Sequence, residues 1–157
     1  DVIILNGPSV KSNIGLNKET QKKNKYYFDR VFNPKTPQNV IFDEISQLVQ
    51  SALDGFKVCI FAYGQTGSGK TYTMEGDKSN PGVIPRSIEK IFNVKTYLER
   101  LGWKFTISLC YFEIYLDQIK DLLSKSNKEK EYFSVKNLKD ITTIIVNSID
   151  EINPYLE

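Results

Sequence analysis

The protein has 157 residues, of which 40 % are hydrophobic and 25 % are charged, and such a chain is expected to fold as one domain with a packed core. It contains no histidine, which excludes Ser-His-Asp and Cys-His catalysis and every His-ligated metal site. Its formal net charge of +2 and its isolated arginines argue against a nucleic-acid partner, and no apolar run approaches the ~20 residues of a membrane span.

The first predicted elements are a strand, a polar stretch and a helix. Val2–Leu5 is predicted to be a short strand that ends at a turn-forming Asn-Gly-Pro, and positions 11–25 a loop or weak hairpin. Thr36 offers an N-cap with Pro37 at the first helical position, and Gly55 ends the helix. The apolar residues of this helix recur at helical spacing: Ile41, Ile45, Leu48, Val49 and Ala52.

An almost uninterrupted apolar run, Phe56–Ala62, follows this helix. It predicts a strand buried on both faces of an α/β sheet. A glycine-rich loop then leads to a helix that starts with Lys70–Met74. Cys59 and Cys110 both lie in apolar runs, and two cysteines are too few for a disulfide framework. We therefore expect buried, reduced thiols and a cytosolic or nuclear protein.

The second half of the chain predicts further alternation of helices and strands. A helix begins at Pro85 and ends at Gly102, and alternating apolar and polar residues over 103–111 predict a long strand. A short helix is expected over Asp117–Leu123 and a strand over Ile141–Val146, followed by a last helix near the C-terminus. This order predicts an α/β sandwich with a substantially parallel sheet.

One motif carries chemistry. It has the P-loop spacing of Gly, four residues and Gly-Lys-Thr: Gly64, Gln65, Thr66, Gly67, Ser68, Gly69, Lys70 and Thr71. Glycines let the backbone curl so that successive N–H groups point at a phosphate, and Lys70 would reach the β- and γ-phosphates. The Thr71 hydroxyl would ligate Mg²⁺. The alternative interpretation, a flexible glycine-rich turn, is disfavoured because the motif lies between a predicted strand and a helix start.

Phosphoryl transfer also needs a second acid for Mg²⁺ and a group that positions water. The nearest candidates are Glu113, within the long predicted strand, and Asp150, after an apolar run. Asp150 is better explained as an acid in the first turn of a helix. For Glu113, the sequence leaves open which face of the strand carries the side chain. We therefore expect phosphate binding without the groups for fast hydrolysis.

The segment Val58–Met74 is similar to the nucleotide-binding core of kinesin motor domains. Further matches follow in the order of that family: Phe28-Asp29-Arg30-Val31-Phe32, Gln47–Phe56, Gly82-Val83-Ile84-Pro85-Arg86, Phe112-Glu113-Ile114-Tyr115 and Asp121-Leu122-Leu123. The resemblance runs from about Tyr26 to the C-terminus. It is closest to the C-terminal-motor, minus-end-directed branch in fungi.

The resemblance implies an α/β, three-layer P-loop NTPase sandwich that is incomplete, with residues 1–157 as the N-terminal portion of one motor domain. The family's Arg-x-Arg-Pro stretch is absent, as are the Ser-Ser-Arg-Ser-His of switch I and the Asp-Leu-Ala-Gly-Ser-Glu of switch II. Pro154 lies where it would weaken the helix before switch I. Tyr72 stands at the position whose aromatic ring packs against adenine in the family.

By this resemblance, the intact protein is an ATP-hydrolysing microtubule motor that uses ATP or ADP with Mg²⁺ and has a coiled coil outside these residues. By the same resemblance, its binding partner is the microtubule (tubulin). Its expected localisation is the cytoplasm and cytoskeleton, with the spindle or nucleus as alternatives. The 157 residues alone are expected to bind nucleotide weakly and to have no catalytic residues for hydrolysis. Lys125–Val146 corresponds to a loop and hairpin that touch tubulin in the family, although its lysines also fit a solvated loop.

Two other functions stay open. A truncated kinesin-like chain could act as an interaction module, because open edges at Phe56–Ala62 would favour a non-native dimer through exposed sheet edges. A small P-loop nucleoside or metabolite kinase would need its own second acid and substrate lid.

Overall fold

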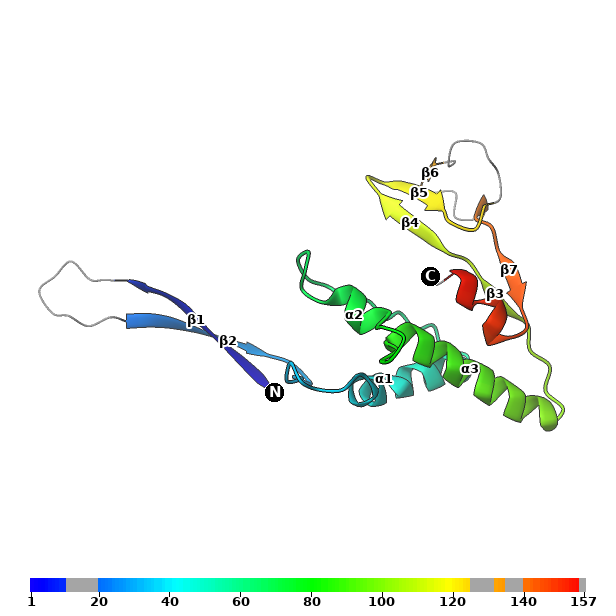
Figure 1. Cartoon of the computed structure of the whole chain (residues 1–157), viewed down its shortest axis with the longest axis horizontal. Coiled ribbons are helices and arrows are strands. Elements are labelled where there is room, and N and C mark those ends of the chain that lie inside the picture. Colours follow the sequence, from blue (N-terminus) through cyan, green and yellow to red (C-terminus); the bar gives the residue numbers. More distant parts are fainter. Residues whose placement is uncertain (11–19, 125–131, 135–139, 156–157) are drawn as a thin grey trace, which may run out of the picture.

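The computed structural model describes residues 1–10, 20–124, 132–134 and 140–155 (Figure 1). Parts of two lysine-rich stretches, 11–25 and 125–146, thus lie outside the described residues. The strands are β1 (Val2–Val10), β2 (Thr20–Tyr27), β3 (Ile107–Leu109), β4 (Phe112–Tyr115), β5 (Gln118–Asp121), β6 (Tyr132–Ser134) and β7 (Ile144–Val146). The helices are α1 (Gln38–Leu53), α2 (Lys70–Met74), α3 (Val83–Arg100) and two 3₁₀ helices, η2 (Ile149–Glu151) and η3 (Asn153–Tyr155).

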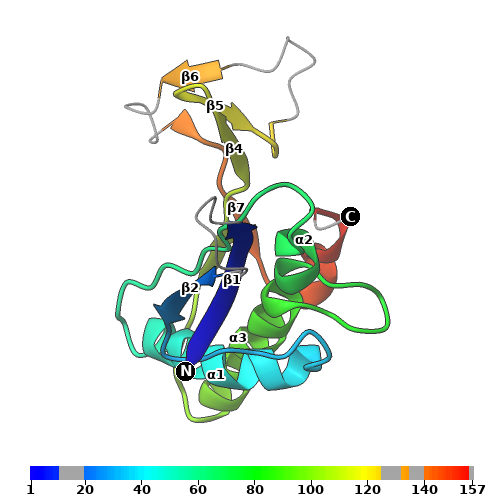
Figure 2. The same cartoon turned by 90° about the vertical axis from the view of Figure 1, so that its left-hand side faces the viewer.

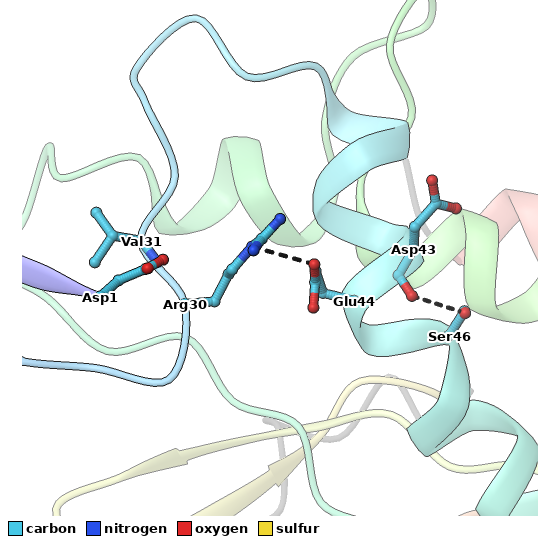
Figure 3. A network of polar contacts seen from close by, with 6 residues as sticks. All are labelled: Asp1, Arg30, Val31, Asp43, Glu44 and Ser46. Carbon is cyan, nitrogen blue, oxygen red and sulfur yellow. Dashed lines mark hydrogen bonds and ion pairs between the residues drawn. The ribbon is translucent and has the colours of Figure 1, made fainter.

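An antiparallel hairpin of β1 and β2 extends away from the helices (Figure 1). The loop or weak hairpin predicted over 11–25 lies mostly outside the described residues, and its last part, from Thr20, belongs to β2. The strand β1 is longer than predicted and does not stop at the turn-forming Asn-Gly-Pro, because a register shift between Asn6 and Ser9 absorbs these residues. At the base of the hairpin, the backbone N–H of Val31 donates to the Asp1 carboxylate at 2.7 Å. Arg30 and Glu44 form an ion pair at 3.1 Å that joins this base to α1 (Figure 3).

Helix α1 confirms the helix predicted from apolar periodicity. Its N-cap is Pro37 rather than Thr36, without a side-chain capping bond. The helix ends before Gly55, whose φ of +98° suits a residue without Cβ. It packs against α3, and Lys90 on α3 donates to the carbonyl oxygen of Ser46 at 2.6 Å.

The strand predicted over Phe56–Ala62 is wrong, because this segment pairs with no strand among the described residues. Its aromatic residues lie largely in solvent, with Phe56 71 % and Phe61 79 % exposed. Cys59 and Cys110 are also exposed rather than buried. An apolar run of this kind is buried only when strands pair with both of its edges, and no described strand does so.

Helix α2 begins at Lys70 as predicted. Helix α3 begins at Val83, two residues before the expected Pro85, since proline is tolerated within a first helical turn. The loop between the two helices is shaped by Asp77, whose carboxylate accepts bonds from Ser79 and from the backbone N–H of Asn80. These bonds, the one from the Ser79 hydroxyl first, hold the pKa of the Asp77 carboxyl below its usual range.

Among the described residues, every strand pair is antiparallel, so the expected parallel pairing is not seen. The long strand expected over 103–111 is shorter: only β3 forms there, and it pairs with β7. The helix expected over Asp117–Leu123 is wrong, because Leu116 and Asp117 make a two-residue turn that pairs β4 with β5. Figure 2 shows the β4-β5-β6 sheet apart from the three α-helices.

The connection after β5 is held by the buried carboxylate of Asp121. It accepts bonds from the backbone N–H groups of Leu123 at 2.9 Å and Thr142 at 2.7 Å. Burial raises the pKa of this carboxyl, but the bonds from Thr142, Leu123 and Ser124 outweigh that effect and hold the pKa below its usual range. Asp121 thus ties the end of β5 to the residues before β7.

The C-terminal end forms two 3₁₀ helices where a last helix was expected. Ser148 makes no side-chain cap, but Glu151 accepts from the backbone N–H of Asn147 at 2.8 Å. Pro154 lies within η3. These turns pack with α3, β3 and β7 in the main apolar cluster, whose buried members are Phe92, Val146 and Ile152.

The apolar core is small for the size of the chain. The chain exposes 13185 Å² of solvent-accessible surface, whereas a compact monomer of 18.0 kDa exposes about 8,000 Å². Many large apolar side chains are therefore uncovered. Within the described ranges, no helix has the length and apolar character needed to cross a membrane.

Candidate functional site

The predicted P-loop lies between the unpaired segment 56–62 and helix α2. Gly67 and Gly69 have φ values of +80° and +90°, a conformation that residues with a Cβ adopt at a cost. At Gly64 a Cβ would collide with the Ser68 hydroxyl oxygen. The loop thus curls tightly because three of its positions have no side chain.

Lys70 reaches back across this loop. Its ammonium donates to the carbonyl oxygens of Gly64 and Gln65, both at 2.8 Å. The side chain that was expected to contact phosphate is therefore held over the start of the loop, with its positive charge inside the curl.

The loop is well supplied with hydrogen-bond donors. Of the backbone N–H groups at positions 66–71, only that of Ser68 donates to an acceptor among the described residues, the carbonyl oxygen of Gln65 at 3.2 Å. A cavity of about 350 Å³ lies against Thr66, Gly67, Gly69, Lys70 and Thr71. Free N–H groups, an ammonium and a hydroxyl around one cavity fit a phosphate group with its divalent cation.

The predicted site residues are brought together except for the ring of Tyr72. Thr66, Gly67, Gly69, Lys70 and Thr71 line the cavity, and Gly64, Gln65 and Ser68 shape the loop through the contacts above. Tyr72 is 52 % exposed and does not line the cavity.

Sequence reasoning missed Gln38, which is 3 % exposed. Its side-chain amide donates to the carbonyl oxygen of Tyr72 at 2.5 Å, across 34 positions of sequence. A glutamine beside Pro37 at a helix start gives no periodic or motif signal, and its burial is evident only from the packing.

The two candidates for a second acid lie elsewhere. Glu113 is on β4 and forms an ion pair with Lys120 at 3.5 Å, and Asp150 is exposed on η2. Neither lines the P-loop cavity. In the described part of the chain, no group of three or more acidic or cysteine side chains could hold a metal ion.

Comparison with known proteins identifies the relatives of this chain. The family model of the kinesin motor domain matches residues 6–157. The kinesin-like protein klpA of Emericella nidulans is 41 % identical over 160 residues, which cover 96 % of this chain and 20 % of klpA.

Solved motor domains have the same fold. The motor domain of the kinesin-like protein Kar3 of Saccharomyces cerevisiae matches with a TM-score of 0.73 and 31 % identity, over 99 % of this chain and 50 % of that one. The Drosophila kinesin family member NOD in complex with AMPPNP matches with a TM-score of 0.76 and 26 % identity, over 85 % of this chain and 46 % of NOD. Both klpA and Kar3 are C-terminal kinesins, which confirms the predicted branch. The chain spans a fifth of klpA and about half of the solved motor-domain chains.

Proposed function

The chain belongs to the kinesin motor-domain family, and on this premise we propose that the loop 64–71 binds the phosphates of ATP or ADP. The observation that carries the proposal is the set of unpaired N–H groups around a cavity whose wall includes the Lys70 ammonium. Phosphate binding would exchange the two carbonyl acceptors of Lys70 for charged oxygens. The bonds to the carbonyl oxygens already have an ionised donor, so the gain comes from the negative charge of the phosphate oxygens, which attract the ammonium more strongly than neutral carbonyl oxygens do.

Thr71 and Tyr72 would complete the nucleotide site. Thr71 lines the cavity, and its hydroxyl would hold Mg²⁺, which would neutralise charge on the β- and γ-phosphates. Tyr72 has a half-exposed ring next to Thr71, so its face is open to a base. The complex of the related NOD with AMPPNP supports nucleotide binding at this fold.

For the whole protein we propose an ATP-driven microtubule motor of the cytoskeleton, active in the cytoplasm, spindle or nucleus. Kinesins are microtubule-associated proteins, and NOD has been described in complex with the microtubule. We further propose that residues 1–157 form the N-terminal part of one motor domain. These residues contain neither switch sequence, so the chain by itself would bind nucleotide weakly without hydrolysing it.

Two assays on the purified chain test this proposal. Fluorescent ADP should bind saturably in the presence of Mg²⁺. Phosphate release from ATP should stay at background with or without microtubules. Microtubule-stimulated turnover by the 157 residues would overturn the proposed division between binding and hydrolysis.

A second candidate function is self-association. It is favoured by the segment Phe56–Ala62, which has no strand partner among the described residues and exposes two phenylalanines. An extended apolar segment with unpaired backbone groups is a template for pairing with a second copy. Static light scattering tests this candidate, because a monomeric mass at micromolar concentration would exclude it.

A further inference from the structure

We propose that Gln38 is a positioning residue for the nucleotide site, which it serves by holding the C-terminal end of helix α2. This inference rests on the proposed nucleotide binding by the loop 64–71. Gln38 is not among the residues that line the cavity, and it acts through its bond to the backbone of Tyr72.

Helix α2 needs outside support because it has only five residues. Helices much shorter than about 12 residues are unstable alone in water, and the last four carbonyl groups of a helix have no partner within it. The Thr71 carbonyl accepts from the backbone N–H groups of Glu75 and Gly76. The Tyr72 carbonyl is satisfied instead by the Gln38 amide at 2.5 Å.

Gln38 is well placed for this task because it stands on a rigid element. It is the first residue of α1, a helix of 16 residues that packs against α3. The segment from Asp54 to Gly69 connects α1 to α2 and contains no strand. The bond from Gln38 to Tyr72 therefore closes this long connection and fixes α2, with Lys70 and Thr71 in its first turn, against the body of the protein.

The amide oxygen of Gln38 offers a way to test its effect on nucleotide affinity separately from its effect on the stability of the protein. The oxygen Oε1 of Gln38 is buried and has no hydrogen-bond partner among the described residues. Turning the amide over would place this oxygen against the Tyr72 carbonyl oxygen, so the donor orientation is the favourable one. A buried acceptor without a partner, such as this oxygen, destabilises the folded protein. A substitution that removes the oxygen therefore offsets the stability lost with the bond to Tyr72. Gln38→Met should thus change stability little while it releases Tyr72.

The experiment compares the wild-type chain with Gln38→Met and with the control Gln50→Met. Gln50 also lies on α1 and also loses a side-chain bond, to Asp54 at 3.0 Å, but this partner follows the end of α1 and is not on α2. Affinity for fluorescent ADP with Mg²⁺, the thermal midpoint, and the exchange rates of the Glu75 and Gly76 amides are measured for all three.

We expect Gln38→Met to bind ADP about five- to tenfold more weakly at a nearly unchanged thermal midpoint, with faster exchange at Glu75 and Gly76. Gln50→Met should match the wild type in affinity and exchange. Wild-type affinity and exchange in Gln38→Met would overturn the proposal, as would a lowered midpoint with unchanged affinity. If the wild-type chain binds no ADP, the proposed function fails, and the exchange rates alone then decide whether Gln38 holds α2.

Discussion

The ammonium of Lys70 donates a hydrogen bond at 2.8 Å to the carbonyl oxygen of Gly64, so the lysine at the end of the phosphate-binding loop is fastened to the glycine at its start. This contact keeps the charge of Lys70 inside the curl when no phosphate is there. Lys70 is therefore held against the loop before any nucleotide binds, and in the proposed site phosphate oxygens would replace its two carbonyl acceptors.

Thr71 should be responsible for the effect of Mg²⁺ on nucleotide affinity. We expect Mg²⁺ to tighten ADP binding by the wild-type chain about tenfold relative to EDTA, because in the proposed site the hydroxyl would be the protein's ligand to the ion. In Thr71→Ala the gain should nearly vanish, whereas Thr71→Ser should keep it. Titrations of fluorescent ADP in both buffers measure this, and an undiminished gain in Thr71→Ala would refute the assignment.

Leu116 is the strained residue of the β4–β5 turn. Its φ is +48°, and that of Asp117 is +59°, a pairing that two-residue hairpin turns require and that asparagine tolerates better than leucine. Since Leu116 is 78 % exposed, it has little packing to lose. Leu116→Asn should raise the free energy of unfolding by about 0.5–1 kcal/mol in urea titrations. Leu116→Ala is the control, and an equal gain from alanine would rule out strain as the cause.

Asp121 should make stability depend on pH. Its pKa lies below the ordinary 3.8, so its contribution is complete above pH 3.8 and is lost as the pH falls through the lower folded value. Asp121→Asn should cost about 1–3 kcal/mol at pH 7, because it leaves buried donors poorly matched. The urea midpoints of the wild type and the variant should converge as the pH falls below 3.8 and the Asp121 carboxyl becomes protonated in the folded protein. Asp43→Asn, which replaces an exposed carboxylate of α1, is the control, and an equal loss of stability at pH 7 in both variants would contradict the role given to the bonds of Asp121.

Phe61 should drive any self-association of the chain. It is 79 % exposed on the unpaired segment, and Phe61→Lys places a charge where a second copy would pair. We expect Phe61→Lys to lower the mass measured by light scattering toward that of a monomer. Tyr97→Lys is the control, because Tyr97 is 62 % exposed but lies on α3 and not on the unpaired segment Phe56–Ala62. An equal decrease for both variants would indicate general solubility instead of strand pairing.

The elements that local signals determine could be predicted from the sequence. Helix α1 follows from the spacing of residues such as Ile41, Ile45 and Val49, and α2 from the motif that ends in Lys70 and Thr71. The motif also predicts a curled loop, and Gly67 and Gly69 in it have positive φ.

The elements that depend on distant partners could not be predicted. The run Phe56–Ala62 has the composition of a buried strand, but composition does not state whether strands are available to pair with it. The β5 strand was taken for a helix because the turn at Leu116 carries an unexpected residue type for positive φ. At the site, Gln38 was missed because burial of a single polar side chain leaves no trace in the sequence pattern.

Calorimetric titration of the 157-residue chain with Mg²⁺ and ADP is the decisive test of whether Lys70 and its loop bind nucleotide phosphates. We predict saturable binding of one nucleotide per chain, weakened about ten- to a hundredfold by Lys70→Met and unchanged by Lys78→Met, which alters an exposed lysine of the next loop. Absence of binding by the wild-type chain, or equal binding by Lys70→Met, would contradict the claim.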